Sequence, residues 1–176
     1  NLTASLIDNL SALDNLETEM ARFRVLKRQV HLVTALSDIA NIWDWAEVTE
    51  QLTTLADICM ARLMRAVAAE AGIEGTPENP APGLFVLAVG KYGARELNYS
   101  SDIDVCVFYD PNIFDGGVLS PGEAAQRVTR EIVRLMTELT GDGYVFRTDL
   151  RLRPDPGSTP LAVSTDMAEL YYESVG

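Results

Sequence analysis

The stretch Leu84–Asp110 constrains the fold more than any other, because two apolar runs in it are separated by a glycine-containing linker and two closely spaced acids. It reads LFVLAVGKYGARELNYSSDIDVCVFYD. The first run stops at Gly90, and the second begins at the acids. Bounded apolar runs of this length predict β-strands, the second over Ile103–Tyr109. Successive side chains on a strand alternate between faces, so we expect Asp102 and Asp104 on the same face.

Residues 84–176 alternate between predicted strands and helices. A helix start is indicated where Ser, Pro and Glu occupy the cap, first and third positions at Ser120–Glu123, and Gly141 is expected to end that helix after Leu139. The other expected elements are a buried strand over Leu84–Val89, one helical turn within Gly93–Leu97, a strand over Tyr144–Leu152, and a last helix capped by Ser164 or Thr165 that continues through Tyr172. This order predicts an α+β fold, a mixed sheet with helices packed on it.

Residues 1–75 are predicted to form a helical segment. Apolar residues recur there at three-to-four spacing, first at Met20, Phe23, Leu26, Val30, Val33, Leu36 and Ala40, and then at Leu52, Leu55, Cys59, Leu63 and Val67. Gly72 is expected to stop the second helix. Residues 74–83 contain three prolines and two glycines, which predicts a loop before the mixed part at 84–176.

Several residues of the helical segment could suggest a functional role, but we expect them to serve the fold instead. Trp43 and Trp45 lie between the two helices and are interpreted as hydrophobic anchors. His31 is the only histidine and lacks a partner of its own kind for a metal or catalytic role. A basic cluster is interpreted as a solvated helix face; it comprises Arg22, Arg24, Lys27 and Arg28.

Charge and composition disfavour several classes of partner. The 176-residue chain has a formal net charge of −12, which disfavours nucleic-acid phosphates and anionic membranes. No run of 18 apolar residues is present, so we expect no membrane span. Cys59 and Cys106 lie far apart in apolar surroundings, as buried thiols do in a reducing compartment such as the cytoplasm. The chain starts at Asn1 without a signal peptide and is expected to be a fragment of a longer protein.

A charged strand face completes the candidate site. Within Tyr144–Leu152 and the two residues after it, alternation places four charged side chains on one face, namely Arg147, Asp149, Arg151 and Arg153. If this strand lies beside Ile103–Tyr109, Asp149 joins Asp102 and Asp104 in a three-carboxylate cluster. Hard carboxylates suit Mg²⁺, and three of them can hold two ions that clamp the attacking and leaving oxygens in phosphoryl-type transfer.

Phosphate-binding groups are expected around these carboxylates. The glycine turn at Gly90 lets phosphates approach backbone N–H groups, and Lys91 supplies a positive charge. Arg151 and Arg153 are expected either to meet phosphate oxygens or to balance the carboxylates. Taken separately, each feature also has a structural interpretation: a surface acidic pair, a plain strand-to-helix turn, or a salt-bridged edge strand. Their occurrence together, in this order, favours a site.

The combined motifs resemble a known family. The small turn, the spaced acids and a third acid on a later strand look like the polymerase-beta-type nucleotidyltransferases. More narrowly, GKYGARELNYSSDIDVCVFYD, YVFRTDLRLRPDPGSTPLAVS and LYYESVG resemble bacterial glutamine synthetase adenylyltransferase/adenylyl-removing enzymes over Leu84–Gly176. The chain departs from the family pattern at Tyr92-Gly93-Ala94, where Leu-Gly-Gly is usual. The stretch ELNYSSDID resembles the N-terminal, adenylyl-removing copy of the two catalytic domains in that family.

The resemblance implies a reaction and its partners. The adenylyl-removing domain cleaves AMP from a tyrosine of glutamine synthetase by phosphorolysis and yields ADP, and the sister domain transfers AMP from ATP to that tyrosine. It implies Mg²⁺ on Asp102, Asp104 and Asp149, phosphate contacts that include Ser101, and regulation by a PII-type signal protein. The alternatives are the forward reaction on the same fold and a catalytically idle nucleotide-sensing or docking module. A calcium-binding scaffold is disfavoured, because no calcium-loop ligand pattern is present.

Overall fold

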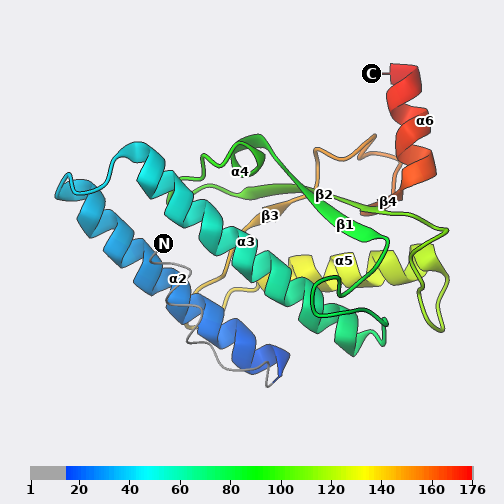
Figure 1. The fold of residues 1–176 in the computed structure, drawn as a ribbon, viewed down its shortest axis with the longest axis horizontal. Coiled ribbons are helices and arrows are strands. Elements are labelled where there is room, and N and C mark those ends of the chain that lie inside the picture. Colours follow the sequence, from blue (N-terminus) through cyan, green and yellow to red (C-terminus); the bar gives the residue numbers. More distant parts are fainter. Residues whose placement is uncertain (1–14, 176) are drawn as a thin grey trace.

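The computed structural model describes residues 15–175, so the predictions for residues 1–14 lie outside it (Figure 1). In chain order the elements are α2 (Leu16–Ile39), α3 (Trp45–Glu70), β1 (Leu84–Val89), α4 (Gly90–Gly93), β2 (Ile103–Tyr109), α5 (Pro121–Thr137), β3 (Thr148–Asp149), β4 (Ala162–Ser164) and α6 (Thr165–Val175). Two helices followed by a mixed sheet with further helices confirm the predicted α+β class. No helix in residues 15–175 is both long and apolar enough to cross a membrane.

Helices α2 and α3 form a hairpin, and a capping box marks the start of α3. The Asp44 carboxylate accepts a hydrogen bond from Glu47 N, and the Glu47 carboxylate accepts one from Asp44 N, a capping box that starts α3. The apolar stripe predicted for α3, from Leu52 to Val67, is buried throughout. Gly72 lies two residues after α3 with φ +74°, in agreement with the predicted stop.

Two predictions for this hairpin were wrong. The buried stripe of α2 continues from Val30 to Thr34, a step of four, and leaves Val33 and Leu36 exposed. Trp45 is not a core anchor, because its side chain is 70% exposed, whereas Trp43 does pack against the core. Aromatic type alone could not separate these two residues, because it does not show which of them packs against the core.

The sheet has four strands among the described residues, with β2 at its centre. β1 pairs with β2 in antiparallel register, while β3 and β4 both pair with β2 in parallel. β1 has the bounds expected for it, but it is an edge strand rather than a buried one. Phe85 and Leu87 on β1 are 41% and 49% exposed.

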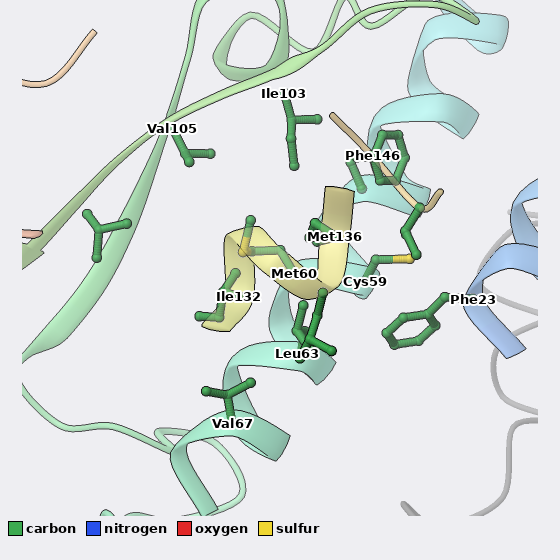
Figure 2. Close-up of a cluster of buried hydrophobic side chains, with 14 of the residues drawn as sticks. Phe23, Cys59, Met60, Leu63, Val67, Ile103, Val105, Ile132, Met136 and Phe146 are labelled. Carbon is green, nitrogen blue, oxygen red and sulfur yellow. The ribbon is translucent and has the colours of Figure 1, made fainter. Parts of the chain in front are cut away.

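The two faces of the sheet differ, and this difference positions the candidate site. Alternate β2 residues Ile103, Val105 and Val107 belong to the main core. Figure 2 shows Ile103 and Val105 pointing toward side chains of α3 and α5, such as Met60 and Ile132. The intervening β2 residues point to the opposite face. There Cys106 and Phe108 form a small second cluster with Val163 of β4 and Ala168 of α6. Asp104 therefore belongs to the face that α3 and α5 do not cover.

Three predicted boundaries around the sheet were wrong. The strand expected over Tyr144–Leu152 is only the two-residue β3, because the N–H groups of Val145 and Phe146 donate to Met136 O at the end of α5 and so do not join a ladder. α5 starts with the expected Ser120 capping box but ends at Thr137, before Leu139. The helical turn expected after Gly93 lies instead at α4, directly after β1.

Candidate active site

The parallel pairing of β2 and β3 brings two predicted site residues together. Asp104 lies directly across from Asp149 in this register, and Ile103 from Thr148. The pairing begins where Ile103 N donates a hydrogen bond to Arg147 O at 2.9 Å. Asp102 lies two residues before Asp104, just ahead of β2. The segment around Asp149 thus lies beside Ile103–Tyr109, which was the condition for a three-carboxylate cluster, although its strand is short.

The electrostatics of the three carboxylates differ. Burial raises the pKa of Asp104 above its ordinary value, and the charges of Asp149 and then Asp102 raise it further. Asp149 behaves in the opposite way, because hydrogen bonds from the side chain and then the backbone of Arg151 lower its pKa. Asp104 is therefore the central carboxylate, close to two others and short of a cation of its own.

An arginine engages each outer carboxylate. Nε of Arg151 donates to both oxygens of Asp149, at 3.0 and 2.8 Å. Arg147 donates to Asp102 through Nε and to the carbonyl oxygen of Ser100 through a terminal nitrogen at 2.9 Å. The sequence placed Arg147 on the charged face but assigned it no role. The signal available was its position two residues before Asp149, and its pairing with Asp102 depends on the β2–β3 register.

The turn before Asp102 is held by its own side chains. Asn98 N donates to Ser101 Oγ at 3.1 Å, and Ser100 N donates to Asn98 Oδ1 at 3.0 Å. The Ser101 hydroxyl thus fixes the path of the chain into β2, and it stays next to Asp102. A contact between Ser101 and a phosphate remains a prediction.

The turn after β1 packs against Asp104. Gly90 has φ +58°, and a Cβ at this position would lie 2.8 Å from Asp104 Oδ2. Lys91 follows with an exposed side chain. The turn is tied to α3 by Arg95, which forms ion pairs with Glu50 at 2.8 Å and Asp57 at 3.0 Å. Glycine is required here for both the backbone conformation and the close approach of a carboxylate.

Arg153 is engaged by backbone rather than by the carboxylates. Its guanidinium donates to four carbonyl oxygens in residues 150–160, those of Leu150, Pro156, Thr159 and Pro160, at 2.8 to 3.2 Å. It therefore closes the loop that follows β3. Strand alternation, which predicted a shared face with Asp149, does not extend beyond that short strand.

The residues fit a divalent cation in donor type and charge. Asp102, Asp104 and Asp149 offer only oxygen ligands from adjacent segments, and the raised pKa of Asp104 reports negative charge that a cation would offset. Within residues 15–175, no three side chains of Asp, Glu, His or Cys converge closely enough to hold an ion as they stand. The two outer carboxylates are engaged by Arg147 and Arg151 instead. Metal binding at this cluster therefore requires that these pairs rearrange.

Comparison with known proteins places the chain in a family. The family model for glutamate-ammonia ligase adenylyltransferase matches residues 1–176. Proteins named bifunctional glutamine synthetase adenylyltransferase/adenylyl-removing enzyme are similar to it. The one from Caulobacter vibrioides is 46% identical over 95% of this chain and 18% of its own length. Those from Brucella suis and Agrobacterium fabrum are 46% and 47% identical over 89% of this chain and 17% of their lengths.

The chain thus spans less than a fifth of the length of these relatives, and it matches within their N-terminal half. The family model nevertheless covers every residue of the chain, including the helical segment that precedes the sheet. The candidate site, with aspartates in register on β2 and β3, lies within this match. The chain belongs to the glutamate-ammonia ligase adenylyltransferase family.

Proposed function

We propose that this domain removes AMP from a tyrosine of adenylylated glutamine synthetase by phosphorolysis. The observation that carries the chemistry is the register of Asp104 with Asp149, with Asp102 two residues away and Gly90 packed against the Asp104 carboxylate. Such a cluster suits nucleotidyl transfer. The names of the relatives include glutamine synthetase, which we take as the protein substrate. In this proposal residues 84–176 carry the chemistry, and the helical segment 1–75 supports them.

Asp102, Asp104 and Asp149 would hold Mg²⁺, in the two-ion arrangement that three carboxylates permit. Bound Mg²⁺ would supply charge stabilisation at the phosphate undergoing transfer. Asp104 is in register with Asp149 and two residues from Asp102, so its carboxylate would be the shared one. The remaining groups proposed to meet phosphate oxygens are Gly90, Lys91, Ser101, Arg151 and Arg153, of which Arg153 would also have to keep its loop closed.

The proposed step exchanges one phosphorus–oxygen bond for another. An oxygen of inorganic phosphate attacks the phosphorus of the AMP group, and the bond from that phosphorus to the tyrosine oxygen breaks. The products are ADP and a tyrosine phenolate, which takes a proton from water. A phenol with a pKa of about 10 is a tolerable leaving group, so the reaction does not require a strong general acid. No histidine is then needed, and the only one in the chain, His31, belongs to α2.

The turn before the aspartates supports this direction of reaction. Asn98 and the second serine, Ser101, are the features by which ELNYSSDID resembles an adenylyl-removing copy. They bond to each other in the structure, and the Ser100 carbonyl accepts a hydrogen bond from Arg147, the partner of Asp102. The residues that distinguish the two copies thus set the approach to the first aspartate. A reducing cytoplasm and a PII-type regulator belong to this proposal as well.

The test gives the purified chain adenylylated glutamine synthetase, Mg²⁺ and inorganic phosphate, and measures ADP. ADP that requires phosphate and disappears in Asp104→Asn would support the proposal. A parallel reaction supplies unmodified synthetase with ATP and measures AMP incorporation, the second activity in the relatives' names. AMP incorporation without phosphorolysis would overturn the proposed direction in favour of adenylylation.

A further inference from the structure

Two members of the basic cluster on α2, Arg24 and Lys27, do not lie on the solvated face expected from the sequence, whereas Arg28 is exposed as expected. Arg24 is buried, with 6% of its side chain exposed, and its guanidinium donates to the Glu138 carbonyl at 3.3 Å. Lys27 is half-buried, and its ammonium lies 4.2 Å from the ring centroid of Tyr144 and 5.1 Å from that of Phe146. These cations face the segment that leads into β3 rather than bulk water.

The cluster borders a hollow of about 430 Å³ between α2 and this segment. Residues that line it include Lys27, Arg28, His31, Tyr99, Asp142 and Tyr144. Arg28 spans to Asp142 at 2.9 Å, and Tyr99 comes from the turn that precedes the aspartates of the candidate site. The hollow therefore adjoins that site but shares none of the three carboxylates.

Positive charge in the hollow is incompletely balanced. Arg28 has Asp142 as its partner, and Arg24 has Glu138. Within residues 15–175 no carboxylate lies within ion-pair distance of Lys27, although the chain has 26 acidic residues. The guanidinium of Arg147 lies 5.9 Å from the ring centroid of Tyr144, the same ring that Lys27 contacts. Two cations thus share one aromatic ring, and only Arg147 has an acid, Asp102.

The titration of the lining groups agrees with this geometry. Burial lowers the pKa of Lys27 to about 8; the buried Cys59 thiol acts against that shift, and Arg147 adds to it. Burial and then Lys27 lower the pKa of His31 to about 4, so its imidazole is neutral at pH 7. A neutral imidazole offers an N–H donor without adding charge. A bound anion would offset the repulsion between Lys27 and its cationic neighbours.

We propose that this hollow is an anion-binding site for a phosphate group, with the Lys27 ammonium as its main contact and His31 as a neutral donor. Both of these donors come from α2 and line the hollow. The Tyr99 hydroxyl also lines the hollow but donates to the Asp38 carboxylate at 3.3 Å. The phosphate group belongs either to inorganic phosphate or to a nucleotide. The site is separate from the aspartates, so its occupancy does not depend on the proposed reaction. Arg147 links the two, since it touches both Tyr144 and Asp102.

The chain suits a direct test, because its only lysines are Lys27 and Lys91. Lysine labelled with ¹³C at Cε gives two resonances, each of which reports the protonation of one amine. A pH titration is recorded in chloride and in inorganic phosphate at equal ionic strength. We expect phosphate to raise the midpoint of Lys27 by about one pH unit, which corresponds to a tenfold preference of the anion for the charged amine.

Two variants and one exchange of ligand complete the test. In Lys27→Met, which keeps an apolar side chain over Tyr144, phosphate should bind at least about tenfold more weakly, as read from the His31 imidazole resonance. In Lys91→Met the Lys27 response should persist. A response to ADP without added phosphate assigns the site to nucleotides, and a response to phosphate alone assigns it to the free ion. A Lys27 midpoint that none of these ligands moves, or unchanged binding in Lys27→Met, would overturn the proposal.

Discussion

Oδ2 of Asp104 lies 2.8 Å from where the Cβ of a side chain at Gly90 would stand. Gly90 also has φ +58°, a conformation that L-residues rarely adopt. The end of β1 and the first residues of β2 thus meet at the central carboxylate of the candidate site. Glycine leaves that carboxylate room to turn toward a ligand.

Gly90→Ala should reduce activity far more than its effect on stability explains. The left-handed conformation costs alanine about 1–2 kcal/mol, and the methyl group would also displace Asp104. Gly72→Ala is the matched control, because Gly72 has φ +74° but no atom within 4 Å of the added Cβ. Both variants should lose similar stability in urea unfolding, and only Gly90→Ala should lose phosphorolysis. Equal activity in the two would show that contact with Asp104 is unimportant.

Asp104→Asn should abolish turnover and yet leave a fold that is at least as stable at neutral pH. The pKa of Asp104 is raised in the folded state, so folded protein binds its proton more tightly than unfolded protein. Its contribution to stability therefore falls as pH rises from the ordinary value of 3.8 through the raised one. We expect a melting temperature roughly 1–2 °C above the parent at pH 7 in EDTA, and no gain near pH 3.

For Asp149, the neighbouring acid, we expect the opposite dependence of stability on pH, and this provides the comparison. The pKa of Asp149 is lowered by Arg151, so its charge stabilises the fold above the ordinary pKa, and this is lost as pH falls. Asp149→Asn should therefore lower the melting temperature at pH 7, in contrast to Asp104→Asn. If both variants shift in the same direction, the assignment of Asp104 as the uncompensated carboxylate is wrong.

Local patterns were sufficient to predict the parts of the site that lie on one segment. The bounds of β1 and β2 follow from two apolar runs, and the start of α5 follows from the Ser120 capping box. The alternation of Asp102 and Asp104 follows from strand geometry. The pairing of Asp149 with β2 was only a condition in the sequence analysis, and the structure meets it.

Contacts between separate elements determine the features that the sequence did not predict. β3 is short because Met136 at the end of α5 accepts the N–H groups of residues 145 and 146, which no local pattern encodes. The pairing of Arg147 with Asp102 depends on the resulting register. Lys27 was assigned to a solvated face because its helical position does not reveal the Tyr144 ring that lies over it. For Arg147 and Lys27 the deciding partner is more than 40 residues away in the sequence, and for β3 it lies on the preceding helix.

Arg147→Gln should increase the affinity of the cluster for divalent cations. Arg147 engages Asp102 with an exposed ion pair, and a metal ion must compete with it for that carboxylate. We expect a few-fold tighter binding of Mn²⁺, used as a probe for Mg²⁺, in calorimetric titration. Arg134→Gln is the matched control, because it breaks a similarly exposed pair, with Glu131, on α5. Unchanged affinity in Arg147→Gln would mean that Asp102 does not contribute to the cation site.

Arg153→Lys should destabilise the fold by about 1–3 kcal/mol, because a lysine cannot span the four carbonyl oxygens that the planar guanidinium joins. Urea unfolding measures the loss. Arg130→Lys is the control, since Arg130 is exposed on α5 and should tolerate the change. If Arg153 acts only through its loop, phosphate affinity should change no more than the loss of folded protein explains. Unchanged stability combined with lost phosphate binding would show instead that Arg153 contacts phosphate directly, as the sequence alone suggested.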